Sequence, residues 1–475
     1  MIDDSVKIHD NFQFEVKLGY NIEKDKKKTE YQVDTYFFFP KSLGINHHTY
    51  SKKDFFRDVQ GFIRYKTPAY SLDDLAKGIG PLEKLGAGDD FESNTKIFCC
   101  ILKSAIRKYL EDKNPNMDLF AELLHKIIER YRSIPVADKD RFFYSLGDED
   151  MSLILESYCF PLLDSVPESK QDALLSILQN EKKHRQEKGM PIPKIGESND
   201  KFLYRKSILK KYVSSVLYLN TTEDKEGKLS NTVFSGVAAG LAMVFATGLT
   251  YIAMLRFGDF TFAFFVTVVL GYVFKDRIKD SLKSYFKHKL GKNIFDHKTR
   301  IFSGKKVAGI IREGFDFERE DKVAVHVQLL RNKDHITEIE NSWVGENVIR
   351  HTKKIILINS ELKLKDYPIT AINDISKINI THYLSKMGEP KRQLYLLDGN
   401  TVIKAEGERV YHVNIVMKFT SEEKIFYKRL RLVLNRAGIK AIEEVNSDQE
   451  SLPTRDIQWR HLIKKLPVKV HLPEK

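Results

Sequence analysis

Two uncharged apolar runs near the middle of the chain stand out from an otherwise mixed pattern of hydrophobic and polar residues. Residues 233–255 carry no charge, and after the four residues 256–259 a second run covers 260–274. At about 1.5 Å per helical residue the first run extends about 34 Å, enough for a hydrocarbon core of about 30 Å. The second run is shorter, but ten of its residues are Phe, Val or Leu. The pattern predicts a transmembrane hairpin over 232–274, with helices at 232–255 and 257–274.

The charges that flank the two runs predict their orientation. Lys225 and Lys228 precede the first run, the turn between the runs holds one arginine, and seven basic residues follow the second run. Because Lys and Arg concentrate on the cytoplasmic side of membrane helices, both termini are expected in the cytoplasm, at the inner or cell membrane if the chain is bacterial. Neither run contains Asp, Glu, Lys, Arg or His, which favours an anchor over an ion pathway.

Small residues in the two runs predict close helix packing. The first run holds eleven Gly, Ala, Ser or Thr residues, a composition that suits contact between helices better than contact with lipid. They form one ridge of Gly236 and Gly240 with Thr247, a second ridge of Ala238, Ala242 and Ala246, and in the second run a ridge of Ala263, Thr267 and Gly271. One ridge of the first helix is expected to pack within the hairpin, and the other to be free for a second copy.

The segment 275–292 reads as a basic juxtamembrane helix. Apolar residues recur in it at helical spacing, and the surrounding basic residues are Lys275, Arg277, Lys279, Lys283, Lys287, Lys289 and Lys292. Anionic lipid head groups attract each Lys or Arg near the surface by about 1 kcal/mol. These seven side chains are therefore the predicted head-group contacts.

Residues 1–188 are predicted to form an N-terminal mixed domain. Residues 11–20 and 31–39 alternate between apolar and polar and predict a β-hairpin. Ser51 and Ser71 each precede an aspartate by three residues, as at helix starts, and helices are expected at about 91–111, 117–132, 149–160 and 168–187. A linker with an amphipathic helix follows at 189–231.

Residues 293–447 are expected to form a C-terminal α+β domain. Residues 323–329 and 411–419 alternate as strands do, and 394–404 contains the Asp398-Gly399 turn of a hairpin. Thr420 and Glu423 predict a capped helix that ends near Gly438. The expected domain is an antiparallel meander closed by this C-terminal helix, and 448–475 is a basic tail. The predicted fold class is thus an integral membrane α-helical hairpin joining a β-hairpin-plus-helices domain to an α+β domain.

Charge, cysteine content and motifs limit the partners and reactions that are expected of this chain. The net charge of +13 arises after the apolar runs, because residues 1–230 hold equal numbers of acidic and basic side chains. Positive charge next to a bilayer favours anionic lipid as the partner and makes nucleic acid an unfavoured one. Cys99, Cys100 and Cys159 suit apolar packing in a reducing compartment. The sequence contains no phosphate-binding loop, zinc-protease, hydrolase or dinucleotide motif, so no catalytic residue, cofactor or metal ligand is predicted.

These features predict a membrane-anchored scaffold or interaction protein with cytoplasmic soluble domains. Its expected partners are the lipid bilayer with its anionic head groups and, through the spare small-residue ridge, a second copy or another protein. Two alternatives remain open from sequence. One is a subunit of an oligomeric channel or transport complex, and the other is an enzyme with an unrecognised site in 293–447.

Overall fold

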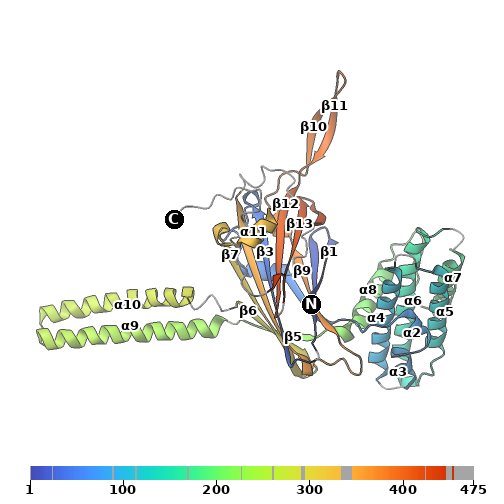
Figure 1. The fold of residues 1–475 in the computed structure, drawn as a ribbon, viewed down its shortest axis with the longest axis horizontal. Helices are drawn as coiled ribbons and strands as arrows, with labels where there is room; N and C mark the ends of the chain where they lie inside the picture. The colour runs from blue at the N-terminus through green and yellow to red at the C-terminus, as the bar shows by residue number, and fades with distance from the viewer. Residues whose placement is uncertain are drawn as a thin grey trace.

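The computed structural model describes the chain except at residues 1, 24, 88–89, 113–114, 168–170, 226, 259–260, 290–294, 333–344, 423, 446–451 and 454–475. The described residues form a mixed helix-and-sheet molecule (Figure 1). A β-body occupies the centre, a helical domain lies on one side of it, and a pair of long helices projects on the other.

Two antiparallel sheets make up the β-body. The larger sheet has the strand order β14 (Gly438–Val445), β13 (Lys424–Asn435), β12 (Tyr411–Ser421), β3 (Lys28–Pro40), β8 (Glu346–Ile358), β7 (Lys306–Glu318), β6 (His297–Ser303) and β5 (Asn220–Lys225). The short strand β15 (Leu452–Pro453) also pairs with β13. The smaller sheet has the order β1 (Ile2–Asp10), β2 (Gln13–Asn21), β9 (Ala371–Asn379) and β4 (Val59–Tyr65). Strands from both ends of the chain therefore share each sheet.

The aromatic run in β3 explains how the larger sheet is covered on both faces. Successive side chains of a strand point to opposite faces. Phe37 and Phe39 accordingly join the main core, which also contains residues of the smaller sheet. Tyr36 and Phe38 point the other way, into a second cluster that includes Val327 of helix α11 (Val325–Arg331). A continuous apolar run here marks a strand that is buried on both sides.

The helical domain confirms most of the helices expected before residue 215. It contains α2 (Leu72–Ala76), α3 (Pro81–Ala87), α4 (Phe91–Leu110), α5 (Met117–Arg132), α6 (Arg141–Leu163), α7 (Asp172–Glu187) and α8 (Asp200–Ser214). The predicted capping boxes at Ser51 and Ser71 are also confirmed, at the starts of α1 (Lys52–Asp58) and α2. In each box the serine accepts a hydrogen bond from the backbone N–H of the aspartate three residues later.

Three expectations about the sheets are wrong. Residues 11–20 and 31–39 are strands, but they do not pair as a hairpin, because β2 pairs with β1 and β9 while β3 pairs with β8 and β12. The alternation at 323–329 belongs largely to helix α11. The predicted C-terminal helix is absent from the described part of 420–438, where β13 instead extends the large sheet. Pairing with β12 leaves the alternate apolar side chains of β13 buried, and this gain overrides the local capping signal.

The predicted transmembrane hairpin of two helices is also wrong. Helices α9 (Gly227–Phe257) and α10 (Phe262–Lys289) do pack along one another (Figure 1). Among the described helices, however, only Thr232–Phe257 of α9 is long and apolar enough to cross a membrane. Helix α10 falls short because charged residues begin at Lys275, so its apolar part is only about 20 Å long against a core of about 30 Å.

Candidate membrane-contact site

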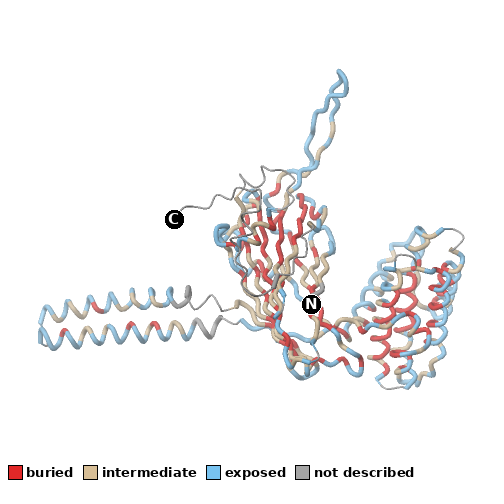
Figure 2. Tube along the Cα trace, in the orientation of Figure 1, coloured by how far each residue is buried: buried red, intermediate tan, exposed pale blue. Residues whose placement is uncertain are grey.

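Small residues form the contact between α9 and α10. Ala238, Ala242 and Ala253 of α9 are buried in a pair that is otherwise mostly exposed (Figure 2). On α10, Gly271 is buried, and a Cβ added there would lie 3.1 Å from the side chain of Leu249. Side chains no larger than a methyl group let the two backbones approach closely here.

The remaining predicted packing residues lie at the edge of this contact or outside it. Ala246 and Thr267 are half-buried, whereas Ala263 is exposed. Gly236 and Gly240 face open space, since a Cβ added to either would meet nothing within 4 Å. The structure thus brings the alanine ridge of α9 against α10 and leaves the glycine ridge outward.

The outer surface of the pair is apolar and uncovered. Figure 2 shows both helices exposed along almost their whole described length. The large exposed side chains include Val237, Leu241, Val244, Phe245, Ile252 and Leu255 of α9, and Phe262, Phe265, Val269, Leu270, Val273 and Phe274 of α10. Soluble proteins rarely expose a continuous apolar surface of this extent, which is typical of membrane or protein contact sites.

The charged half of α10 lies at the end of the pair next to the β-body. Arg277, Lys279 and Lys283 are exposed there, and the Lys275 ammonium lies 4.2 Å from the ring centre of Tyr272. Of the other predicted head-group contacts, Lys287 and Lys289 belong to the end of α10, and Lys292 is outside the described residues.

Strands β5 and β6 fix where the pair leaves and returns. β5 ends at Lys225 just before α9, β6 begins at His297 after α10, and these two residues are opposite one another in the sheet. The chain therefore enters and leaves the helix pair at the same edge of the β-body. The apolar ends of both helices lie at the far end of the pair (Figure 1).

A second notable group, which the sequence did not reveal, is an ion network buried between the two sheets. Lys353 of β8 lies 2.8 Å from Asp374 of β9 and 3.3 Å from Glu313 of β7. His351 is 3.3 Å from the same glutamate. The network links a lysine of the larger sheet to an aspartate of the smaller one. Its members are scattered from residue 313 to 374, on strands whose neighbours only the fold establishes.

Burial and charge set the protonation of this network. Burial alone would raise the pKa of Glu313, but Lys353 and His351 outweigh it and hold that pKa well below its ordinary value. Burial would lower the pKa of Lys353, but Asp374 and Glu313 raise it above its ordinary value. Lys353 is therefore a cation at neutral pH, and its ammonium group is paired with two carboxylates. A lysine in this state is unsuited to act as a general base or nucleophile.

The cavity beside Lys353 is small. Its volume is about 40 Å³. Apolar side chains of both sheets form most of its lining, and the polar residues that line it are Thr35, His351, Lys353 and Ser376. A water needs about 10–15 Å³ of such space, so the cavity has room for a few waters and not for an organic substrate.

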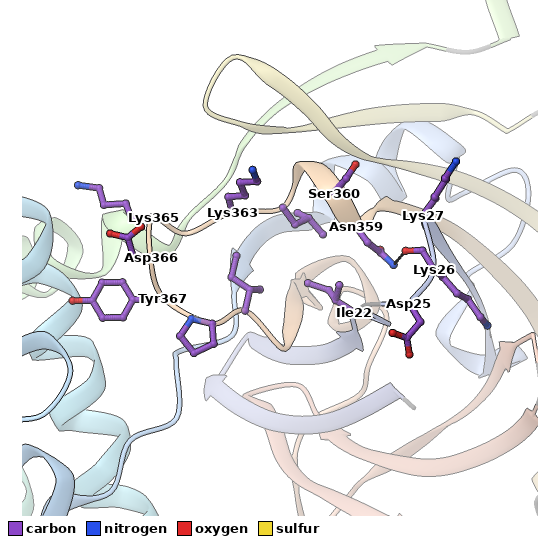
Figure 3. Close-up of a pocket in the computed structure, with 13 residues that line it drawn as sticks. Ile22, Asp25, Lys26, Lys27, Asn359, Ser360, Lys363, Lys365, Asp366 and Tyr367 are labelled. Carbon is purple, nitrogen blue, oxygen red and sulfur yellow. Dashed lines mark hydrogen bonds between the residues drawn. The ribbon is translucent and has the colours of Figure 1, made fainter.

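An open pocket of about 810 Å³ lies beside the segment 359–369 (Figure 3). Four lysines line it, but Lys26 pairs with Glu422 and Lys365 with Asp90. Two aspartates also face the pocket, and Asn359 donates a hydrogen bond to the backbone of Lys26. The charge of this pocket is therefore largely balanced within the chain.

Carboxylates in the helical domain are also engaged in ion pairs. Asp148 of α6 lies 3.0 Å from Arg132 of α5 and 2.6 Å from His184 of α7. Arg132 also contacts Glu181 at 2.9 Å, so this group ties three helices together. Nearby, burial raises the pKa of Asp150 to about 6.

Throughout the described residues no group of three or more His, Cys, Asp or Glu side chains is placed to hold a metal ion.

Comparisons of this chain with protein-family models, with curated proteins and with solved structures gave no match.

Proposed function

We propose that this protein is attached to a lipid bilayer through the apolar end of the α9–α10 pair and presents its other parts as a platform for interaction. The observation that carries the proposal is the exposed apolar surface of the pair. Helix α9 supports it by being long and apolar enough to span a membrane. Lipid would remove this surface from water, and within each helix the backbone groups are already paired with one another.

The basic half of α10 supports the same arrangement. With the apolar end in lipid, Arg277, Lys279 and Lys283 would lie nearer the surface, toward the β-body. Anionic head groups at that level would add attraction to the apolar insertion.

The pairing and burial of the polar groups favour a role in binding over a role in catalysis. Lys353 is enclosed and paired, and the pocket beside 359–369 has nearly balanced charge. In contrast, the molecule presents a helical domain and a projecting two-stranded arm beyond the membrane-contact helices, as a scaffold does.

Flotation with vesicles tests the proposal. The purified full-length chain, mixed in detergent with neutral phosphatidylcholine and dialysed, should float with the vesicles on a density gradient and remain there in 1 M salt. Neutral lipid isolates the apolar contribution from charge attraction. Recovery of the protein at the bottom of the gradient would refute attachment by the apolar end.

The head-group contribution is testable with charge variants. Replacing Lys275, Lys279 and Lys283 together with Gln should weaken binding to anionic vesicles by roughly 100-fold at low salt, at about 1 kcal/mol per lysine. The matched control replaces three exposed lysines of the helical domain, Lys182, Lys183 and Lys188, and changes net charge equally. Equal losses in the two variants would show that only the overall charge matters, and would count against a head-group site on α10.

A further inference from the structure

A two-stranded arm projects from the β-body outside both sheets. It consists of β10 (Lys391–Asp398) and β11 (Thr401–Glu408), joined by a turn at Gly399 with a φ of 58° that suits glycine. This confirms the hairpin expected from the Asp398-Gly399 pair. Figure 1 shows the arm pointing away from both the helix pair and the helical domain. Every residue of β10 is exposed, and an isolated two-stranded ribbon is only marginally stable in water.

The register of the arm places two successive apolar pairs on one face. Leu394 is opposite Ala405, and Leu396 is opposite Ile403. Opposite residues in an antiparallel pair point to the same side, and residues two apart along a strand share a face. These four residues therefore form one continuous surface, which we call the apolar face.

The other face of the arm is largely polar. Lys391 and Glu406 form an ion pair of 2.8 Å across it, and Tyr395 is opposite Lys404. Leu397, opposite Val402, is its one fully apolar rung. The two faces thus differ in composition, since the apolar face has two adjacent apolar pairs and the other face has one.

Charges at the two ends of the apolar face indicate what covers it. Arg392 lies on this face at the base of the arm, and Asp398 lies on it at the tip. A second arm packed in the opposite direction would place its aspartate next to this arginine, and its arginine next to this aspartate. Such a contact is self-complementary and closes with two-fold symmetry. Insertion of the tip into lipid, in contrast, would drive the Asp398 carboxylate into the bilayer first.

We propose that the apolar face of the arm packs against the same face of a second copy of this chain, in antiparallel orientation. Leu394, Leu396, Ile403 and Ala405 of each copy form the contact, and Arg392 pairs with Asp398 of the partner at both ends. The proposal concerns the arm and stands independently of how the protein is attached to membranes.

Sedimentation of the full-length chain in detergent micelles tests this contact by comparing the two faces. The unmodified protein should contain two chains per particle. Leu396→Lys should give one chain, while Leu397→Lys, its neighbour on the other face, should still give two. Leu396 and Leu397 are 54% and 77% exposed, so neither substitution disturbs a core. A monomeric unmodified chain, a dimeric Leu396→Lys variant, or equal dissociation of both variants would overturn the proposal.

Exchanging the charges of Arg392 and Asp398 tests the antiparallel orientation of the contact. Arg392→Glu and Asp398→Lys should each weaken dimerisation at least tenfold, because each brings like charges together twice in the symmetric contact. The double variant should recover it, since it restores opposite charges with their positions swapped. Failure of the double variant to recover would remove the antiparallel pairing of base and tip.

Discussion

Replacing Lys353 with Met is expected to lower the free energy of unfolding of the β-body by about 3–5 kcal/mol. The substitution preserves an apolar stem of similar length but leaves the buried Asp374 and the mostly buried Glu313 without their cation. Removal of one partner from a buried ion pair costs this much because the remaining charge is no longer compensated. Hydrogen exchange of the β8 and β9 amides in the full-length protein would measure the change.

Lys354 provides the matched control. It is the next residue of β8, points to the other face, and pairs with Glu30 where both side chains are about a third to a half exposed. Lys354→Met should cost less than about 1 kcal/mol, because exposed ion pairs contribute little. Similar protection in the two variants would show that the buried network does not hold the sheets together.

The effect of Lys353→Met should also depend on pH. In the native protein the pKa of Glu313 lies below its ordinary 4.5, so this group stabilises the fold above about pH 4.5, and the contribution is lost as pH falls toward the lowered pKa. The pKa of Lys353 lies above its ordinary 10.5, so its contribution is complete below about pH 10.5 and is lost as pH rises. The loss caused by the substitution should therefore be largest between about pH 5 and 10. It should shrink in acid, where the stranded Glu313 takes up a proton.

Membrane retention should fall sharply in the variant Ile252→Asp. Ile252 lies on the outer surface of α9, beside the apolar half of α10, and is 59% exposed. Exchanging Ile for Asp near the centre of a membrane helix costs about 3–4 kcal/mol, which corresponds to a shift of roughly 100-fold or more in partitioning. Density-gradient flotation of cell membranes should find much more of this variant in the soluble fraction than of the unmodified protein.

Leu203→Asp serves as the control for that experiment. Leu203 is also exposed, at 60%, but it belongs to α8 of the helical domain. An aspartate at this equally exposed position should leave membrane retention unchanged. Retention of Ile252→Asp at the level of this control would mean that the outer surface of α9 does not contact lipid.

Local signals in the sequence predicted many elements of this fold correctly. The capping boxes at Ser51 and Ser71, the turn at Gly399 and the helices α4 and α5 follow from side chains within a few residues of one another. Such signals act through local hydrogen bonds and helical periodicity, so the sequence displays them directly.

Strand partners could not be predicted in the same way. β3 pairs with β8 and β12, more than 300 residues away along the chain, and alternation in a strand says only which side chains share a face. The segment that became β13 carried a helix-start signal, which burial in the sheet overrode. The Lys353 network depends on these pairings, so it was hidden for the same reason.

The prediction of a second transmembrane helix was wrong because its apolar segment is too short. Apolar character at 260–274 correctly indicated a helix beside α9. Because charge begins at Lys275, however, α9 is the only one of the described helices that is long and apolar enough to cross a membrane. The small residues that suggested close packing include Ala238 and Ala242, which lie buried against α10. Which ridge faces the partner helix depends on the rotation of the helices, which spacing alone does not determine.

Alkaline carbonate extraction tests membrane attachment most directly. Membranes from cells that produce the full-length chain would be washed at pH 11, which releases proteins held by charge or by contact with other proteins. Insertion of the apolar end of α9–α10 predicts that the protein stays in the membrane pellet. Its complete release into the supernatant would contradict attachment through these helices.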